Sequence, residues 1–377
     1  MSAERIGLAV VGCGGFGLFA LQQFTQVPGV RLVGMAGTHR PAALAAAARF
    51  GVEAVEDPGE LLRRDDVHLV YIATPPFLHH PQALAALEAG KHVLCEKPLA
   101  LTVAQADEMV AAARRRDRLL AVNLMQRYNP LAAAVGRLVE GRVLGEFLHG
   151  SFENLASDEQ LPAGHWFWDR AKSGGIFVEH GVHFFDLFAG WFGPGRVEAA
   201  QVGTRPGGGV EEHVGCTVRH GDALVNFYHG FHQAGRMDRQ ELRLVFERGD
   251  VTLSEWVPTR ARIHALLDER QTRELCELFP GGRLDVTATY AGQDRACRGR
   301  GKAIDAYQLV ELTAGAGAVK GHVYGELLVA LMADQAAWIR DRSHRRVVTE
   351  ENGRESLATA CTADRLAHEA VAGGAGR

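Results

Sequence analysis

Three polar side chains near the middle of the chain have the types and spacing of an acid/base group. Within segment 173–186, Glu179, His183 and Asp186 follow one another at intervals of four and three residues. If the segment is helical, the three side chains lie on one face. A carboxylate and an imidazole placed in this way can act as an acid/base pair beside a hydroxyl substrate. The rest of the segment is largely apolar, so burying these polar groups without a purpose would cost free energy.

Two other interpretations of this segment stay open. The polar groups could form a hydrogen-bonded buried network. They could also bind a metal through His180, His183 and a carboxylate. No further cluster of metal ligands stands out in the sequence, so we expect no metal site.

A lysine follows a short apolar run that is typical of a buried strand, residues 92–95. The chain continues Glu96-Lys97-Pro98. The carboxyl ends of strands in a doubly wound sheet face the ligand cleft, and the proline restricts the backbone next to the lysine. There Lys97 could donate a proton or a hydrogen bond to a substrate oxygen, although most lysines are surface charges.

A glycine-rich turn lies between a predicted strand at 6–11 and a predicted helix at 16–26. It matches the pattern GxGxxG and contains Gly12, Gly14, Gly15, Phe16 and Gly17. Such glycines permit a tight turn, close approach of the backbone to a pyrophosphate, and close packing of helix on strand. The turn therefore predicts dinucleotide binding, against the alternative of a structural turn.

The residues after the second predicted strand bear on the choice of dinucleotide. A carboxylate at this position would hold the ribose 2′-hydroxyl of NAD. The chain instead reads Gly37-Thr38-His39-Arg40. A hydroxyl, an imidazole and a guanidinium suit the 2′-phosphate of NADP, although Arg40 could simply be solvated at the start of the next helix. We expect NAD(P), with NADP favoured.

Strand-like and helix-like segments alternate up to about residue 125, and period-2 runs joined by short turns follow. The alternation predicts an α/β chain with a doubly wound Rossmann domain at 1–125. The second pattern predicts an α+β domain with an open, mostly antiparallel sheet at 126–377. Helical patterns return at 324–341 and 356–371, and these helices could pack back on the first domain. Residues 268–320 suggest loops and an insertion.

Composition narrows the class of protein. The chain has 377 residues, a net charge of −4 and six cysteines, no two of them in a CxxC pair. This charge does not favour binding to nucleic acid or to an anionic membrane. The first apolar run, 6–11, is too short for a signal peptide or a membrane span. We expect a cytoplasmic protein with free thiols.

Together these motifs resemble the Gfo/Idh/MocA family, named after glucose–fructose oxidoreductase and inositol dehydrogenase. The resemblance also rests on Thr74-Pro75 with His79 four residues on, and on the run from Ala83 to Ala100 that contains Glu96 and Lys97. It implies a homodimer or homotetramer that uses the open sheet face. It also implies that Thr74, Pro75, His79 and Glu96 lie at the cofactor.

The resemblance assigns roles by position. Lys97 matches a lysine that contacts substrate and nicotinamide, and His183 matches the usual acid/base. Glu179 stands where the family usually has aspartate, which leaves its role as partner of His183 or as substrate ligand open. Residues assigned to the substrate by position, with His180 added from the same segment, are Arg127, Tyr128, Trp166, Trp168 and Asp169.

The function implied is transfer of a hydride between a nicotinamide and a secondary alcohol or ketone of a sugar, cyclitol or related polyol. Other functions on the same scaffold stay open. The chain could reduce an imine or a conjugated double bond, act as a redox-assisted glycosidase, or sense dinucleotides without catalysis. Retention of both Lys97 and His183 argues against the sensor.

Overall fold

The computed structural model describes residues 5–37, 40–315 and 317–374. The chain divides into two compact units. The first contains Met1–Met125, Ala163–Asp186 and Gly325–Cys361, and the second contains Gln126–Pro162, Leu187–Tyr324 and Thr362–Arg377. The first unit thus takes in the segment that carries Glu179 and His183, together with residues 325–340 and 350–361 of the two long C-terminal helices.

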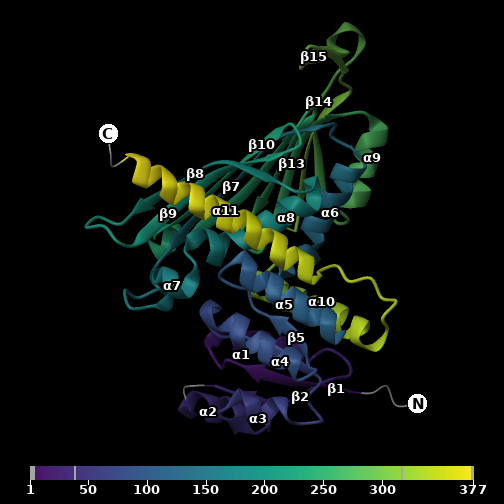
Figure 1. Cartoon of the computed structure of the whole chain (residues 1–377). Coiled ribbons are helices and arrows are strands. Elements are labelled where there is room, and N and C mark those ends of the chain that lie inside the picture. The colour runs from purple at the N-terminus through teal and green to yellow at the C-terminus, as the bar shows by residue number, and fades with distance from the viewer. Residues whose placement is uncertain (1–4, 38–39, 316, 375–377) are drawn as a thin grey trace. The chain divides into compact units, whose positions relative to one another are not determined.

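The first unit is built on a six-stranded parallel sheet in the order β3-β2-β1-β4-β5-β6. Strands β1, β2 and β5 of this sheet are labelled in Figure 1, beside α1 and α4. Every residue of β1, β4 and β5 is buried, because helices cover both faces of such a sheet. The strand order reverses between β1 and β4, which is where ligands bind in folds of this kind. The strands are β1 (Ile6–Val11), β2 (Val30–Ala36), β3 (Ala54–Val55), β4 (Leu69–Ile72), β5 (His92–Cys95) and β6 (Leu120–Val122). The prediction of a Rossmann sheet is confirmed.

Helices connect these strands, and local signals fix several of their starts. The side chain of Asp57 accepts a hydrogen bond from Gly59 at the start of α3, and Thr102 caps α5 through the backbone N–H of Gln105. The helices of this first stretch are α1 (Gly15–Phe24), α2 (Arg40–Phe50), α3 (Pro58–Leu62), the 3₁₀ turn η1 (Pro76–Leu78), α4 (His79–Glu88) and α5 (Val103–Arg116). Farther along the chain come η3 (Trp166–Trp168), α7 (Arg170–Ser173), the π-helical turn η4 (Phe177–Gly181), α8 (Val182–Phe192), α10 (Lys320–Arg340) and α11 (Glu350–Gly374).

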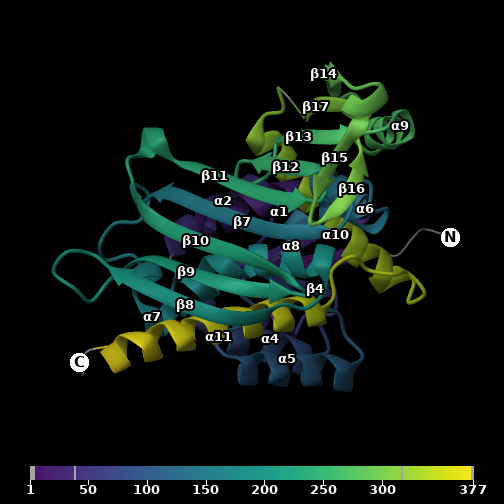
Figure 2. The same ribbon diagram turned by 90° about the horizontal axis from the view of Figure 1, so that it is seen from above.

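The second unit is built on a nine-stranded sheet in the order β14-β17-β13-β12-β11-β7-β10-β9-β8. All neighbouring strands are antiparallel except β7 and β10. The prediction of an open, mostly antiparallel sheet is therefore confirmed. Figure 2 shows these strands side by side across the broad face of the sheet. They are β7 (Phe147–Ser157), β8 (Arg196–Thr204), β9 (Glu211–His220), β10 (Ala223–Gln233), β11 (Arg239–Phe246), β12 (Gly249–Ser254), β13 (Arg260–Leu267), β14 (Arg283–Thr289) and β17 (Gln308–Ala314).

Aromatic packing on one face of this sheet holds α8. Phe188 meets Phe227 of β10 edge to face, with ring centroids 5.0 Å apart, and Phe192 stacks on Phe147 of β7. The unit also contains η2 (Met125–Tyr128), α6 (Pro130–Glu140), η5 (Gly235–Met237), α9 (Glu269–Leu278), η6 (Gly292–Arg295) and a small hairpin of β15 (Ala296–Gly299) and β16 (Lys302–Asp305).

The interpretation of residues 268–320 as loops with an insertion was largely wrong. Asp268 and Gln271 form a capping box that starts α9, and β17 pairs with both β13 and β14. Strand β14 alternates polar and apolar side chains from Arg283 to Thr289, the pattern of a strand, although every one of its residues is exposed or half-buried. Among the helices of the described residues, none is long and apolar enough to cross a membrane.

Candidate active site

The turn after β1 has the geometry of a dinucleotide site. Gly12 adopts a φ of +106°, and a Cβ there would lie 2.4 Å from the backbone oxygen of Ala73. A Cβ on Gly17 would lie 2.9 Å from the Cβ of Ala73, so this glycine lets α1 pack against the end of β4. Only glycine fits at either position.

The start of α1 leaves room for a phosphate. The N-cap residue of α1 is Gly14, so no capping side chain bonds to the N–H groups of the first turn. A Cβ on Gly14 or Gly15 would meet no atom within 4 Å, and Phe16 is 37% exposed. Backbone N–H groups at an open helix start bind anions, so this turn fits a pyrophosphate.

Beyond β2, Gly37 opens on a cavity of about 260 Å³. The carboxylates in its lining belong to Glu53, Glu56 and Glu60. Arg40 begins α2. Thr38 and His39, which the sequence assigned to the cofactor, lie outside the described residues.

His79 ties together two turns at the carboxyl edge of the sheet. Its ring is fully buried, with Nε2 2.8 Å from the carbonyl oxygen of Thr74 and Nδ1 2.7 Å from that of Pro98. The Thr74 hydroxyl donates to Gln82 at 2.7 Å, and Pro75 precedes η1. Both ring nitrogens of His79 are therefore engaged by the backbone, which positions the loop that carries Lys97.

Glu96 has partners on the two neighbouring strands. Its Oε1 accepts hydrogen bonds from the Tyr71 hydroxyl at 2.6 Å and from the Asn123 side-chain amide at 2.7 Å. Burial raises the pKa of the Glu96 carboxyl, and these two hydrogen bonds oppose that rise. The sequence carries no local signal for these contacts, because the three residues come from different strand ends.

Lys97 and Glu179 form a largely buried ion pair. The ammonium of Lys97 donates to Glu179 Oε1 at 2.5 Å and to the backbone oxygen of Glu179 at 2.9 Å. The exposed fractions of the two side chains are 18% and 11%. Glu179 thus contacts the lysine that the sequence placed at the chemistry, and it fixes the position of the ammonium group.

His183 lies at the start of α8, immediately after the π-helical turn that contains Glu179 and His180. The prediction of an ordinary helix through this segment was wrong for residues 177–181. A π-turn widens the spacing of side chains, and such turns are frequent at functional sites. Burial, and then the positive charge of Lys97, hold the pKa of His183 well below its usual value. Its imidazole is therefore neutral near pH 7.

Other polar groups of the segment are also buried. Asp186 is 2% exposed and His180 9% exposed, and the ring of His180 lies 5.6 Å from that of Phe184. Lys97 pairs with Glu179 and its charge acts on His183, so the three residues lie near one another within the first unit.

The side chains around residue 167 are largely engaged in contacts within their own segment. Trp166 and Trp168 are half-buried in η3. Asp169 caps α7 by accepting from the N–H of Ala171 at 3.0 Å, and its carboxylate pairs with Lys172 at 2.9 Å. This hydrogen bond from Lys172 lowers the pKa of Asp169. A substrate contact of Asp169 would have to compete with both partners.

Arg127 and Tyr128 belong to the second unit, in η2. The guanidinium of Arg127 packs on α8 at Gly190, where a Cβ would lie 2.2 Å from Nη1 of Arg127. A side chain at position 190 would require the guanidinium of Arg127 to move. The side chains of Arg127 and Tyr128 are half-buried.

One group of described side chains is close enough to share a cation. Ligand atoms of Glu211, Asp364 and His368, all in the second unit, lie within 4.8 Å of one another. Nε2 of His368 is 3.3 Å from the Glu211 carboxylate, and its Nδ1 is 2.8 Å from the backbone oxygen of Asp364. Direct contacts of the His368 ring with Glu211 and Asp364 account for this arrangement.

Comparison with known families identifies two regions of the chain. Residues 6–124 match the model described as "Oxidoreductase family, NAD-binding Rossmann fold", and residues 132–252 match the C-terminal domain model of the same family. The chain belongs to the Gfo/Idh/MocA oxidoreductase family.

Relatives within the Gfo/Idh/MocA family act on sugars and cyclitols, as their names state. The chain is 41% identical over 145 residues to inositol 2-dehydrogenase of Rubrobacter xylanophilus, covering 38% of this chain and 42% of the relative. It is 34% identical over 183 residues to dTDP-3,4-didehydro-2,6-dideoxy-alpha-D-glucose 3-reductase of Actinomadura kijaniata, covering 48% and 54%. The matched region thus spans about half the length of these relatives.

The same fold extends over nearly the whole chain. A levoglucosan dehydrogenase solved in complex with NADH superposes with a TM-score of 0.77 at 20% identity, covering 97% of this chain and 98% of that one. At 20% identity, this similarity shows that the chain has the same fold as the levoglucosan dehydrogenase, and it shows nothing about activity.

Proposed function

We propose that the chain is an NAD(P)-dependent dehydrogenase or reductase that interconverts a secondary alcohol and a ketone on a sugar, cyclitol or related polyol. The observation that carries the proposal is the ion pair of Lys97 and Glu179 beside a buried, neutral His183, in the unit that holds the Gly12–Gly17 turn. The names of the relatives support the substrate class.

The residues divide the work of the reaction. When bound, the nicotinamide supplies two-electron chemistry at C4, taking a hydride from the carbinol carbon or returning it. In the oxidation direction the carbinol loses its hydroxyl proton to His183, and the carbon–oxygen double bond forms. Lys97 donates a hydrogen bond to the substrate oxygen, and Glu179 holds the ammonium in place. His79 and Glu96 position the turns around Lys97.

Binding of the substrate is assigned to half-buried and buried polar groups. Arg127, Tyr128, Trp166 and Trp168 offer donors and flat surfaces of the kind that sugars bind. His180 lies in the same segment as His183. Asp169 is the weakest of these assignments, because its carboxylate already caps α7 and pairs with Lys172.

The proposal is tested by mixing the purified protein with panels of polyols, sugars and their keto forms in the presence of NAD or NADP. Absorbance of the reduced nicotinamide should rise with an alcohol or fall with a ketone. Substrate turnover without release of reduced cofactor would indicate the redox-assisted glycosidase instead. Dinucleotide binding without any turnover would indicate the sensor.

The cofactor is proposed to be NADP, on the evidence of residues 37–40. Glu53, Glu56 and Glu60 would repel a 2′-phosphate placed in the cavity beside Gly37, so the proposal of NADP rests on the residue types Thr38, His39 and Arg40. A charged hydrogen bond contributes roughly 1.5–3 kcal/mol, so Arg40→Ala should weaken NADP about tenfold to hundredfold and leave NAD unchanged. Fluorescence titration measures both affinities, and equal affinities in the parent protein would contradict the proposal.

A further inference from the structure

A cavity of about 530 Å³ opens at the amino ends of the parallel strands, where Ile6 begins β1 and His92 begins β5. The Gly12–Gly17 turn follows the opposite, carboxyl end of β1, so this cavity is separate from the dinucleotide site. All of its lining residues belong to the first unit. Its cationic side chains are Arg5, Lys91, Arg118 and Arg340.

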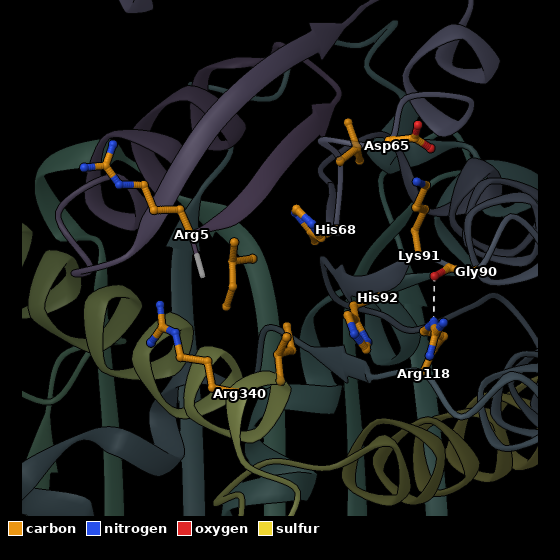
Figure 3. A pocket seen from close by; sticks show the side chains of 11 residues that line it. Arg5, Asp65, His68, Gly90, Lys91, His92, Arg118 and Arg340 are labelled. Atoms are coloured by element: carbon orange, nitrogen blue, oxygen red, sulfur yellow. Dashed lines mark hydrogen bonds between the residues drawn. The ribbon is translucent and has the colours of Figure 1, made fainter. Parts of the chain in front are cut away.

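Two imidazoles in the lining have their tautomers fixed by the backbone. Nδ1 of His68 accepts from the N–H of Gly7 at 2.9 Å, and Nδ1 of His92 accepts from the N–H of Leu119 at 2.8 Å. Backbone amides only donate, so each Nδ1 is unprotonated and each neutral ring carries its proton on Nε2. Neither Nε2 has a hydrogen-bond acceptor among residues 5–37, 40–315 and 317–374. His92 is nevertheless only 9% exposed. Figure 3 shows both rings at the cavity.

The charges around the cavity are mostly positive. Burial, followed by the charges of Arg342, Arg118 and His68, lowers the pKa of His92 to about 3, so its ring is neutral near pH 7. Arg118 donates to the backbone oxygen of Gly90 at 2.6 Å, a contact drawn in Figure 3, and Lys91 donates to that of Arg64 at 2.7 Å. These contacts hold the two cations at the rim without cancelling their charge.

The remaining residues that line the cavity add more hydrogen-bond donors than acceptors. Arg340 donates to the backbone oxygen of Pro28 at 3.0 Å, and Arg5 makes no hydrogen bond or ion pair within the part of the chain that the structure describes. Asp65 is the one carboxylate among the lining residues. Apolar wall is supplied by Ile6, Val67 and Ile339.

We propose that this cavity is a binding site for a small organic oxyanion, in which His68 and His92 donate through Nε2 and the surrounding arginines supply the charge. The ligand has to bring acceptors, because the lining is dominated by donors. The ligand has to be anionic, because cationic side chains surround the cavity and the imidazoles of His68 and His92 can only donate hydrogen bonds there. A phosphate ester and a carboxylate share this chemistry, and the apolar wall suits a short carbon skeleton on either.

Calorimetric titration of the full-length protein with inorganic phosphate tests the proposal. Saturating dinucleotide occupies the Gly12–Gly17 turn, and constant ionic strength separates binding from screening. A parallel titration with citrate distinguishes a phosphate site from a carboxylate site, and chloride serves as the blank. Saturable binding of either oxyanion is the expected result, and heats no different from chloride for both would overturn the proposal.

Three substitutions locate the site. His92→Asn keeps an acceptor for the N–H of Leu119, because asparagine Oδ1 and histidine Nδ1 are equally far along their side chains, and it removes the Nε2 donor. It should weaken binding of the oxyanion about tenfold or more, and Arg5→Gln should weaken it by a smaller factor. Arg63→Gln, which removes an exposed charge 3.9 Å from Asp57 and outside the cavity, should leave the affinity unchanged.

A local readout separates loss of the site from loss of folding. In imidazole ¹⁵N spectra, His68 and His92 should both show a protonated Nε2, and the bound oxyanion should shift both Nε2 signals and raise the pKa of His92. If His92→Asn does not fold, His68→Asn removes the other donor by the same logic, because it keeps an acceptor for Gly7. Equal weakening by Arg63→Gln, or unshifted Nε2 signals at saturation, would contradict the assignment.

Discussion

Replacing Glu179 with glutamine removes the negative charge that holds Lys97 and keeps the length and shape of the side chain. In the parent protein the Lys97 ammonium donates to the Glu179 carboxylate at 2.5 Å and to its backbone oxygen at 2.9 Å. The glutamine variant keeps the backbone contact and a neutral acceptor. Hydrogen bonds to charged groups contribute roughly 1.5–3 kcal/mol and neutral ones about 0.5–1.5 kcal/mol. The difference, about 1–1.5 kcal/mol, predicts a roughly five- to thirteenfold loss in kcat/KM.

A double-mutant cycle with Lys97→Met shows whether Glu179 acts through the lysine. Loss of a positioned proton or hydrogen-bond donor lowers turnover by about 10²- to 10⁴-fold. With Lys97 gone, Glu179 has no ammonium to hold, so adding Glu179→Gln should cost less than about 0.5 kcal/mol more. Steady-state rates from nicotinamide absorbance give both numbers, and melting temperatures of all variants serve as the control.

The opposite outcome would refute this reasoning. If Glu179→Gln costs as much in the Lys97→Met background as in the parent protein, the two residues act independently. Glu179 would then act directly on the substrate or on His183, as the spacing of the two residues in the sequence suggested.

Three further predictions concern binding, stability and assembly. Gly12→Ala should reduce dinucleotide affinity or melting temperature measurably, because a Cβ at φ +106° costs about 1–2 kcal/mol before its 2.4 Å clash with Ala73, and unchanged values would contradict the turn geometry. Stability should be full above pH 6.5 and should fall as the pH drops towards 3, because burial lowers the pKa of His229 from 6.5 to about 3 and the unfolded chain takes up the proton first. His229→Leu should flatten that dependence by up to about 1.4 kcal/mol per pH unit in urea unfolding, and an unchanged slope would contradict the assignment. Light scattering at micromolar concentration should show a homodimer or homotetramer through the sheet of the second unit, and a monomer would count against it.

The Rossmann part of the fold was predictable because β1, β4 and β5 are buried on both faces and therefore read as continuous apolar runs. The edge of the second sheet was not predictable in the same way. Strand β14 has no buried residue, and its sequence marks it only by the alternation of polar and apolar side chains from Arg283 to Thr289, not by an apolar run.

The site followed a similar division. Lys97 and His183 could be chosen from residue type and from position after a strand or within an apolar helix. The partner of Glu179 could not, because the π-turn at 177–181 has no sequence signature and Lys97 is 82 residues away. The backbone contacts of His79 were equally hidden, since Thr74 and Pro98 meet only once β4 and β5 lie side by side.

Single-turnover kinetics of His183→Ala test the central claim, that this buried neutral imidazole accepts the proton when the substrate is oxidised. Dinucleotide affinity and melting temperature are measured on the same sample, because the main dinucleotide contacts are expected at the Gly12–Gly17 turn. We predict a loss of about 10²- to 10⁴-fold in the rate of nicotinamide reduction, with affinity and melting temperature retained. A near-normal rate would contradict the account, and a lowered melting temperature without cofactor would assign His183 to a structural buried network.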